Sequence, residues 1–334
     1  MAAKPIVAGT DGSEESLRAV DWAAREAALR GAPLRIVAAA ALLPRMASRV
    51  GTVDYDTVTD VLLQERDRTL AAAAERAART APGLLIDADP LDGQPAQAVT
   101  ESGAGALMLV LGSRGIGAFT ALLLGSVSRY AASHASCPVV VVRDEAPSPH
   151  GLVGVGVADL DTCGDALTFA FEEASLRKAS LLAVHAWHTP QTDISRAGQM
   201  SAAPEQQAVA GDEGRHLTAL LDEWRAKYPD VPVSQEVMHG HPGRALVGLS
   251  ARADLVVVGR HAKHPGLPGA GSVRHAVLNH AHGPVVTAPR CRRPIPGASS
   301  RSAPTLDQLA ADRAAVSPDA RSSWRKLVIN GPIW

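Results

Sequence analysis

Short apolar segments alternate with longer amphipathic ones along most of the 334-residue chain. The apolar segments are continuous runs, a pattern typical of parallel strands that are buried on both faces. Strands that alternate with helices indicate a doubly wound α/β fold. In the first half of the chain the runs predict strands at Pro5–Thr10, Leu34–Ala41, Leu84–Ala88, Leu107–Leu111 and Val139–Val142. The intervening segments predict helices at Glu14–Arg30, Asp56–Thr80, Pro95–Ser102 and Ser126–Ser136.

The whole pattern occurs twice. Gly156 follows Gly9 by 147 residues, and Gly259 follows Gly112 by the same interval. From Gly125 onward the interval is 146, as between Gly125 and Gly271. A constant offset with one deletion indicates an internal duplication. The second set of strands is expected at Val153–Val157, Leu181–Trp187, Val233–Val237, Leu255–Val258 and Val285–Ala288.

These patterns predict two five-stranded parallel-sheet domains. The first domain covers residues 1–145 and the second covers residues 151–290; we call them the first and second repeats. Residues 291–334 lie outside the duplication and begin rich in Pro, Ser and Arg, with one short helical pattern near Leu306–Val316. We expect this tail to be mostly flexible or to dock through its apolar end.

Composition narrows the classes of function. The 33 basic and 34 acidic residues give a net charge of −1, which offers no electrostatic reason to expect nucleic acid or a membrane surface as a partner. Three widely spaced cysteines suggest neither a disulfide framework nor a zinc motif. The N-terminus lacks the pattern of a signal peptide, so we expect a cytoplasmic protein.

Two glycine clusters follow the fourth strand of the first repeat. Gly112 and Gly115 come at the strand end, and Gly125-Ser126 opens the next helix. Glycines let the main chain approach phosphate oxygens, and the N–H groups of a helix N-terminus favour anions. No Walker lysine and no dinucleotide fingerprint accompany them. From the glycines alone, a phosphate site and a pair of ordinary turns remain equally open.

The spacing G-x2-G-x9-G-[ST] resembles the ATP-binding signature of universal stress proteins, and the flanking sequences "VAGTDGSEES" and "GSVSRYAASHASCPVVVV" agree with it. The resemblance covers both repeats but not the tail, and the chain looks like a tandem universal stress protein. It implies an adenine-nucleotide alpha hydrolase-like fold, and ATP (with or without Mg) as the cofactor. It also implies pairing of the two domains through their last strands, within one chain or in a homodimer.

The resemblance also implies which residues contact the nucleotide. Asp11 and Gly9 would line the base and ribose side, and Ala39 would occupy the adenine-facing position on the second strand. The phosphates would meet the glycine loop and the helix that follows it. The implied loop residues are Gly112, Ser113, Arg114, Gly115, Gly117, Gly125, Ser126 and Val127. Asp11 as a simple turn and helix cap is the competing interpretation.

The second repeat keeps only part of this pattern. Gly156, Gly259, Gly271, Ser272 and Val273 remain as weaker candidates. Ala158 stands in place of Asp11, Ala262 in place of Gly115, and Pro265 and Pro268 remove two backbone donors from the loop. We therefore predict one competent nucleotide site, in the first repeat.

Histidines gather in the second repeat, and we expect its third and fourth strands to be neighbours. His239 and His241 would then lie near His261 and His264, where a metal or pH-sensing site is conceivable. Solvated loop histidines are the simpler interpretation, and we predict no metal site.

Three functions remain open on the sequence. The first is an ATP-binding regulatory protein of the stress response, acting through an unidentified protein partner. The second is a weak ATPase or nucleotidyl transferase, for which no base or metal-binding carboxylate can be named. The third is an interaction protein with vestigial nucleotide sites, which the altered second repeat favours.

Overall fold

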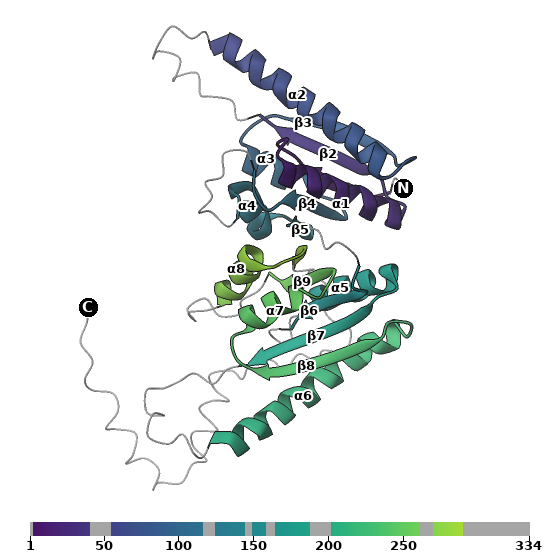
Figure 1. Cartoon of the computed structure of the whole chain (residues 1–334), viewed down its shortest axis with the longest axis vertical. Coiled ribbons are helices and arrows are strands. Elements are labelled where there is room, and N and C mark those ends of the chain that lie inside the picture. Colours follow the sequence, from purple (N-terminus) through teal and green to yellow (C-terminus); the bar gives the residue numbers. More distant parts are fainter. Residues whose placement is uncertain are drawn as a thin grey trace, which may run out of the picture. The chain divides into compact units, whose positions relative to one another are not determined.

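A computed structural model describes residues 3–40, 55–115, 124–143, 149–157, 164–187, 202–260 and 270–289. In the first repeat the elements are β1 (Ile6–Gly9), α1 (Glu14–Arg30), β2 (Leu34–Ala39), α2 (Tyr55–Thr80), β3 (Ile86–Leu91), α3 (Pro95–Ser102), β4 (Met108–Gly112), α4 (Ser126–His134) and β5 (Val139–Val142). In the second they are β6 (Leu152–Gly156), α5 (Gly164–Arg177), β7 (Ser180–Trp187), α6 (Ala202–Lys227), β8 (Val233–His239), α7 (Pro242–Ser250), β9 (Leu255–Gly259), α8 (Ala270–His280) and β10 (Val285–Ala288) (Figure 1).

The ten strands form one sheet in the order β3-β2-β1-β4-β5-β10-β9-β6-β7-β8. Neighbouring strands are parallel within each repeat, and β5 pairs with β10 antiparallel. The predicted doubly wound α/β fold is confirmed in both repeats, and the two last strands join within the chain as the resemblance implied.

The first helix follows directly from its sequence. Ser13 caps α1, because its side chain accepts the Ser16 N–H, and Glu14 and Glu15 face the positive end of the helix dipole. Gly31 ends the helix in the left-handed conformation, at φ 61°, where a side chain would be strained. Both ends match the sequence prediction.

Two apolar layers cover the two faces of the sheet, and each extends across both repeats. One layer packs α1, α2, α5 and α6 onto the sheet, with Ile36, Phe171 and Leu217 among its buried residues. The other packs α3, α4, α7 and α8, with Leu109 and Val256 at its centre. Continuous burial on both faces explains why the inner strands are uninterrupted apolar runs.

Some boundaries differ from prediction. The third strand is Ile86–Leu91 rather than Leu84–Ala88, because β3 is an edge strand that tolerates Asp89 and Pro90. The α4 helix ends at His134, before Ser136. The helical pattern near Leu306–Val316 lies outside the described residues.

The expected neighbourhood of the third and fourth strands in the second repeat is wrong. Two strands, β6 and β7, lie between β8 and β9 and separate His239, at the end of β8, from the end of β9. In the part of the chain that the structure describes, no three His, Cys, Asp or Glu side chains are placed to hold a metal ion.

Four charged side chains meet where the repeats join, two from α1 and two from α5. Arg30 binds Glu26 (2.5 Å) and Glu173, while Arg177 binds Glu173 (3.0 Å) and Glu26. Both carboxylates are at most 1% exposed. The group is pseudosymmetric, since Glu173 and Arg177 follow Glu26 and Arg30 by the 147-residue repeat offset. We call these four residues the junction cluster.

Aromatic rings extend the same symmetry. The Arg177 guanidinium lies 5.7 Å from the centre of the Trp22 ring, and that of Arg30 lies 6.0 Å from the centre of the Phe169 ring. Trp22 and Phe169 are themselves equivalent by the repeat offset. Each arginine therefore binds a carboxylate pair and stacks on a ring from the other repeat.

The junction cluster makes stability depend on pH. Burial raises the pKa of Glu173 to about 7, and the Glu26 charge adds to the rise against the opposing effect of the two arginines. The folded protein thus holds this proton more tightly than the unfolded chain does, so this group contributes stability as the pH falls from about 7 to about 4.5. In Glu173→Gln that contribution should vanish. Urea unfolding of both proteins at several pH values measures the free energy of unfolding. If this free energy changes with pH by the same amount in the two proteins, the assignment to Glu173 is contradicted.

Candidate functional site

The carboxyl ends of β1 and β4 meet at the point where strand order reverses in the first repeat. Along the chain, β1 is followed by β2 on one side, whereas β4 and β5 lie on the other. Asp11 follows β1, and Gly112 is the last residue of β4. Ligands of open α/β sheets bind in the crevice that forms at this reversal.

Gly112 packs against the first turn of α1. A Cβ at this position would lie 2.8 Å from the carbonyl carbon and oxygen of Glu15 and 2.9 Å from the Ser16 nitrogen. These are backbone atoms and cannot move aside. The glycine therefore allows the end of β4 to pack directly against the start of α1.

Asp11 and Gly115 lie against each other just beyond the ends of β1 and β4. Asp11 Oδ1 accepts the Ser13 N–H (3.1 Å) and the Ser13 hydroxyl (2.6 Å). A Cβ on Gly115 would overlap Asp11 Oδ2. The structure thus brings together two residues, about a hundred positions apart in the chain, that the sequence analysis assigned to one site.

A buried hydroxyl pair supports this turn. Thr10 Oγ1 and Ser16 Oγ are 3.0 Å apart, and they accept the N–H groups of Gly12 and Asp11 at 3.2 and 3.3 Å. The sequence analysis did not identify either residue. Both could have been found in the sequence as polar residues at buried positions, Thr10 after a buried strand and Ser16 on the buried face of α1.

The N-terminus of α4 lies beside the residues that follow β4, since the Gly125 N–H donates to Ser113 O. Its N-cap, Gly125, offers no side-chain hydrogen bond, and the first turn contains no acidic residue. Since the Arg129 N–H makes the first intrahelical bond, to Gly125 O at 3.0 Å, the N–H groups of Ser126 and Val127 precede it and point out of the helix. Ser126 is exposed, and the helix end is suited to an anion.

The two sides of the glycine loop are tied together at its base. The Gly125 N–H donates to Ser113 O at 2.8 Å, the Ser113 N–H donates to Val142 O at 3.0 Å, and Ser128 Oγ donates to Gly112 O at 2.6 Å. Ser113 is 3% exposed, whereas Arg114 lies on the exposed surface. Ser113 therefore positions the loop, and Arg114 projects from it. Gly117 lies outside the described residues.

Gly9 and Ala39 occupy the neighbouring strands. A Cβ on Gly9 would lie 2.6 Å from Leu111 Cδ2 and 3.0 Å from Val99 Cγ1, so the space beside this glycine is filled by the apolar core. Ala39 ends β2, opposite Leu91, and is partly buried.

The second repeat retains the backbone plan and changes the side chains around it. Gly156 meets Leu246 just as Gly9 meets Val99, and Gly259 ends β9. Gly271, Ser272 and Val273 belong to the first turns of α8. The positions equivalent to Asp11 and Gly115, residues 158 and 262, lie outside the described residues.

Bulky side chains stand at the end of β7, where β2 carries alanines. His185 replaces Ala38; its Nδ1–H donates to Val157 O at 2.7 Å, and its Nε2 lies 3.4 Å from Glu213. Trp187 replaces Ala40 and packs edge-on against His239, with 4.7 Å between ring centres. The side chains at the end of β7 are therefore larger than those at the end of β2.

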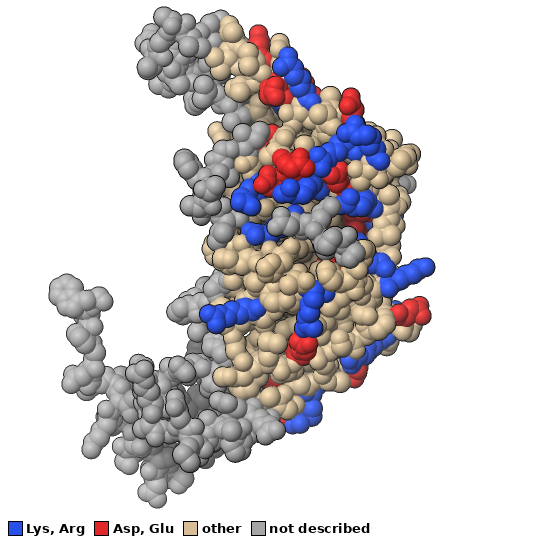
Figure 2. All heavy atoms as spheres, viewed as in Figure 1, with Lys and Arg blue, Asp and Glu red and all other residues tan. Residues whose placement is uncertain are grey.

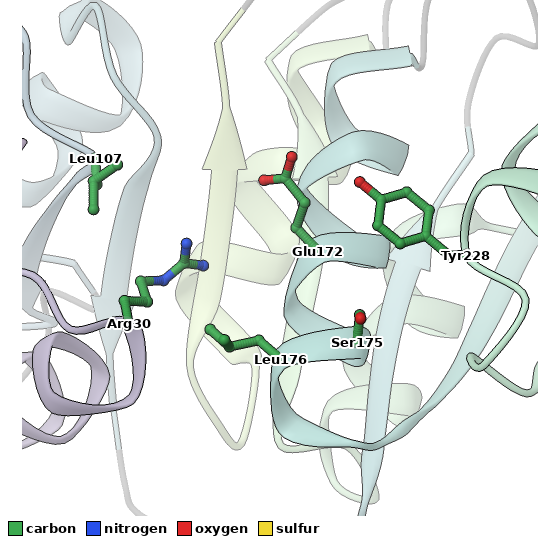
Figure 3. A pocket seen from close by; sticks show the side chains of 6 residues that line it. All are labelled: Arg30, Leu107, Glu172, Ser175, Leu176 and Tyr228. Atoms are coloured by element: carbon green, nitrogen blue, oxygen red, sulfur yellow. The ribbon is translucent and has the colours of Figure 1, made fainter.

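A separate cavity lies beside the junction cluster, near the end of β4 that is opposite the glycine loop. It has a volume of about 450 Å³ and is lined by Arg30, Leu107, Glu172, Ser175, Leu176 and Tyr228 (Figure 3). Leu107 precedes β4, at the end opposite Gly112. No glycine of the loop and no helix N-terminus contributes to it, so it is unrelated to the crevice at Asp11 and Gly115.

The charges of the described surface are mixed in sign. Figure 2 shows Lys and Arg side chains next to Asp and Glu side chains over the first repeat. Arg76 of α2, for example, binds Asp21 (2.7 Å) and Glu14 (3.1 Å) of α1. Among the described residues no helix has the length and apolar character needed to cross a membrane.

The fold and the crevice define a doubly wound α/β protein with a glycine loop at its strand-order reversal. Residues 2–143 and 152–289 each match the universal stress protein family, and the chain belongs to this family. Universal stress protein Rv2005c of Mycobacterium tuberculosis is 38% identical over 297 residues, which cover 85% of this chain and 96% of that protein. Universal stress protein Rv2623 of the same organism is 32% identical over 295 residues, or 85% and 95% of the two chains.

A solved structure has the same fold. The crystal structure of a universal stress protein from Archaeoglobus fulgidus covers 87% of this chain and 100% of its own, with a TM-score of 0.59 at 17% sequence identity. This similarity extends over both repeats.

Proposed function

We propose that the first repeat binds ATP in the crevice between β1 and β4, and that the protein acts as a nucleotide-dependent regulatory module. The observation that carries the proposal is the close approach of Asp11 and Gly115 beside the end of β4, where the N-terminus of α4 has no side-chain cap and its N-cap Gly125 bonds to Ser113. Family membership and the G-x2-G-x9-G-[ST] spacing support it.

The residues present fit an adenine nucleotide. The exposed N–H groups at the start of α4, with Ser126 and Arg114, offer donors to phosphate oxygens. Asp11, at the end of β1, offers a carboxylate to ribose hydroxyls, and Ala39 leaves room beside β2 for the base. The proposal assigns no magnesium ligand and no catalytic residue.

The first test is direct. The full-length protein is titrated with ATP in a calorimeter, and any nucleotide that co-purifies is released by denaturation and identified by chromatography. We expect saturable binding of one ATP per chain that persists unhydrolysed. ADP that accumulates during incubation would favour the ATPase instead, and absence of measurable affinity would favour an interaction protein with vestigial sites.

Gly115→Ala should weaken ATP binding with little effect on folding. The new methyl group displaces the Asp11 carboxylate, which is the end of an accessible side chain, so the thermal midpoint should hardly change. Loss of charged hydrogen bonds of this kind costs roughly tenfold or more in affinity. The matched control is Gly248→Ala on α7, where a Cβ meets nothing within 4 Å among the described residues. Equal ATP affinity in the two variants would refute the placement of the site.

A further inference from the structure

A chain of hydroxyl groups lies behind the turn of Asp11. Thr10, the residue after β1, and Ser16, in the first turn of α1, are 7% and 4% exposed, and their hydroxyl oxygens are 3.0 Å apart. Ser16 Oγ donates to Ser13 O at 2.9 Å, and Ser13 Oγ donates to Asp11 Oδ1 at 2.6 Å. We call Thr10, Ser13 and Ser16 the hydroxyl chain.

The directions of the hydrogen bonds in the hydroxyl chain are fixed, because each hydroxyl has a single hydrogen. The Ser16 hydrogen is used on Ser13 O, which can only accept, so Thr10 must be the donor in the bond between Thr10 and Ser16. The same two oxygens accept the N–H groups of Gly12 at 3.2 Å and of Asp11 at 3.3 Å. Neither hydroxyl can therefore rotate without losing a hydrogen bond.

The hydroxyl chain ends on the exposed carboxylate of Asp11. Asp11 Oδ1 accepts both the N–H and the hydroxyl of Ser13, which holds the carboxylate in one orientation. Its second oxygen, Oδ2, faces Gly115, where a Cβ would overlap it. Thr10 and Ser16 are buried beneath the turn, so they act on a ligand only through Asp11.

The fold does not require the hydroxyl chain. At all four equivalent positions the second repeat lacks a hydroxyl and a carboxylate. The residues that replace Thr10, Asp11, Ser13 and Ser16 are, in this order, Val157, Ala158, Leu160 and Cys163. The strand end is nevertheless built in the same way, because the Val157 N–H donates to Val184 O at 2.9 Å, as the Thr10 N–H does to Val37 O. A polar network that the sheet can dispense with, and that ends on a site residue, is typical of the support that holds a binding group in position.

We infer that Thr10 and Ser16 are positioning residues of the nucleotide site, which hold the Asp11 carboxylate where it accepts hydrogen bonds from the ribose hydroxyls. An ionised carboxylate only accepts, so the ligand group that meets it must be a donor. This inference rests on the proposed function and deepens it, since it assigns the preference of the site for ribose to two buried hydroxyls. It also explains why the carboxylate and its support are replaced together in the second repeat.

The test compares ATP with 2′,3′-dideoxy-ATP, which lacks both ribose hydroxyls, in calorimetric titrations of the full chain. Thr10→Val keeps the shape of the side chain and removes the hydroxyl, and Ser16→Ala removes the next one. We expect each variant to bind ATP roughly three- to tenfold more weakly than wild type, the value of about one hydrogen bond. The affinity for dideoxy-ATP should not change, because this nucleotide offers Asp11 no donor.

Two controls separate positioning from folding. Thr10→Ser keeps the hydroxyl, so its ATP affinity should stay within about twofold of wild type. Ser250→Ala removes a buried hydroxyl from the second repeat, where Ser250 Oγ donates to Val247 O at 2.6 Å and accepts the His282 N–H at 2.9 Å. This control should lower the thermal unfolding midpoint about as much as Thr10→Val does, and it should leave the affinities for both nucleotides unchanged.

Two results would overturn the inference. One is an equal loss of affinity for ATP and for dideoxy-ATP in Thr10→Val and Ser16→Ala, which would show that the hydroxyls only support the turn. The other is an ATP affinity that neither variant changes. Failure of the proposed function is distinguishable from both, because wild type itself would then bind no ATP.

Discussion

Arg177→Met is expected to lower the free energy of unfolding by about 3–5 kcal/mol at a pH well above the pKa of about 7 of Glu173, where both carboxylates are ionised; this is the cost of breaking one side of a buried ion pair. The substitution leaves Glu26 and Glu173, both fully buried, to share Arg30 alone. It also removes the contact of the guanidinium with the Trp22 ring. Methionine fills most of the volume of the arginine stem, so the loss reports charge rather than a cavity.

Equilibrium unfolding in urea measures this effect. The control is Arg225→Met, because Arg225 forms an exposed pair with Asp222 (3.0 Å) that is worth at most about 1 kcal/mol. Adding Glu173→Gln to Arg177→Met should recover part of the loss, since it removes one uncompensated carboxylate. If Arg177→Met costs no more than Arg225→Met, the junction cluster contributes nothing measurable to holding the repeats together.

Gly112→Ala is the second substitution with a large expected effect. A single methyl group would be forced to within 2.8 Å of the Glu15 backbone, so β4 and α1 must separate. Overpacking of this kind costs about 1–3 kcal/mol, and we expect the upper end because backbone atoms form the obstacle. The displaced strand end also carries Ser113 and the loop, so ATP affinity should fall together with stability.

The second repeat provides the comparison for Gly112. Of the described residues, none lies within 4 Å of a Cβ placed on Gly259. Gly259→Ala should therefore change the free energy of unfolding by much less than Gly112→Ala, and it should leave ATP binding intact. Differential scanning calorimetry of the two variants, with and without ATP, decides this. Equal destabilisation would show that both repeats need the close approach.

The success of the sequence prediction has a physical basis. Strands buried on both faces must be continuous apolar runs, so β1, β4 and β5 could be predicted from hydrophobicity alone. The prediction was less accurate for β3, because an edge strand lacks burial on one side and its pattern is weaker. No local sequence pattern indicates the order of strands in a sheet. This explains why β8 and β9 were wrongly predicted to be neighbours.

The candidate site was predictable only in part. Asp11 and Gly115 come together, in keeping with their assignment to one site by the resemblance, and periodicity alone could not have shown this. The packing role of Gly112 and the hydroxyl pair of Thr10 and Ser16 depend on tertiary contacts between distant segments. The junction cluster could have been predicted from the sequence. Glu26 and Arg30 recur as Glu173 and Arg177 at the repeat offset, on the core-facing side of a helix.

The antiparallel junction of β5 and β10 has a consequence for how the two halves can diverge. In an assembly of identical subunits every substitution occurs on both sides of the interface. Here the halves are covalently linked, so their association does not depend on protein concentration, and each molecule contains one copy of each half. Arg260 and Arg274 can therefore stand in one half while the equivalent positions of the other half carry Ser113 and Ser128. The linkage permits the two halves of one molecule to carry different residues at equivalent positions, which a symmetric dimer cannot do.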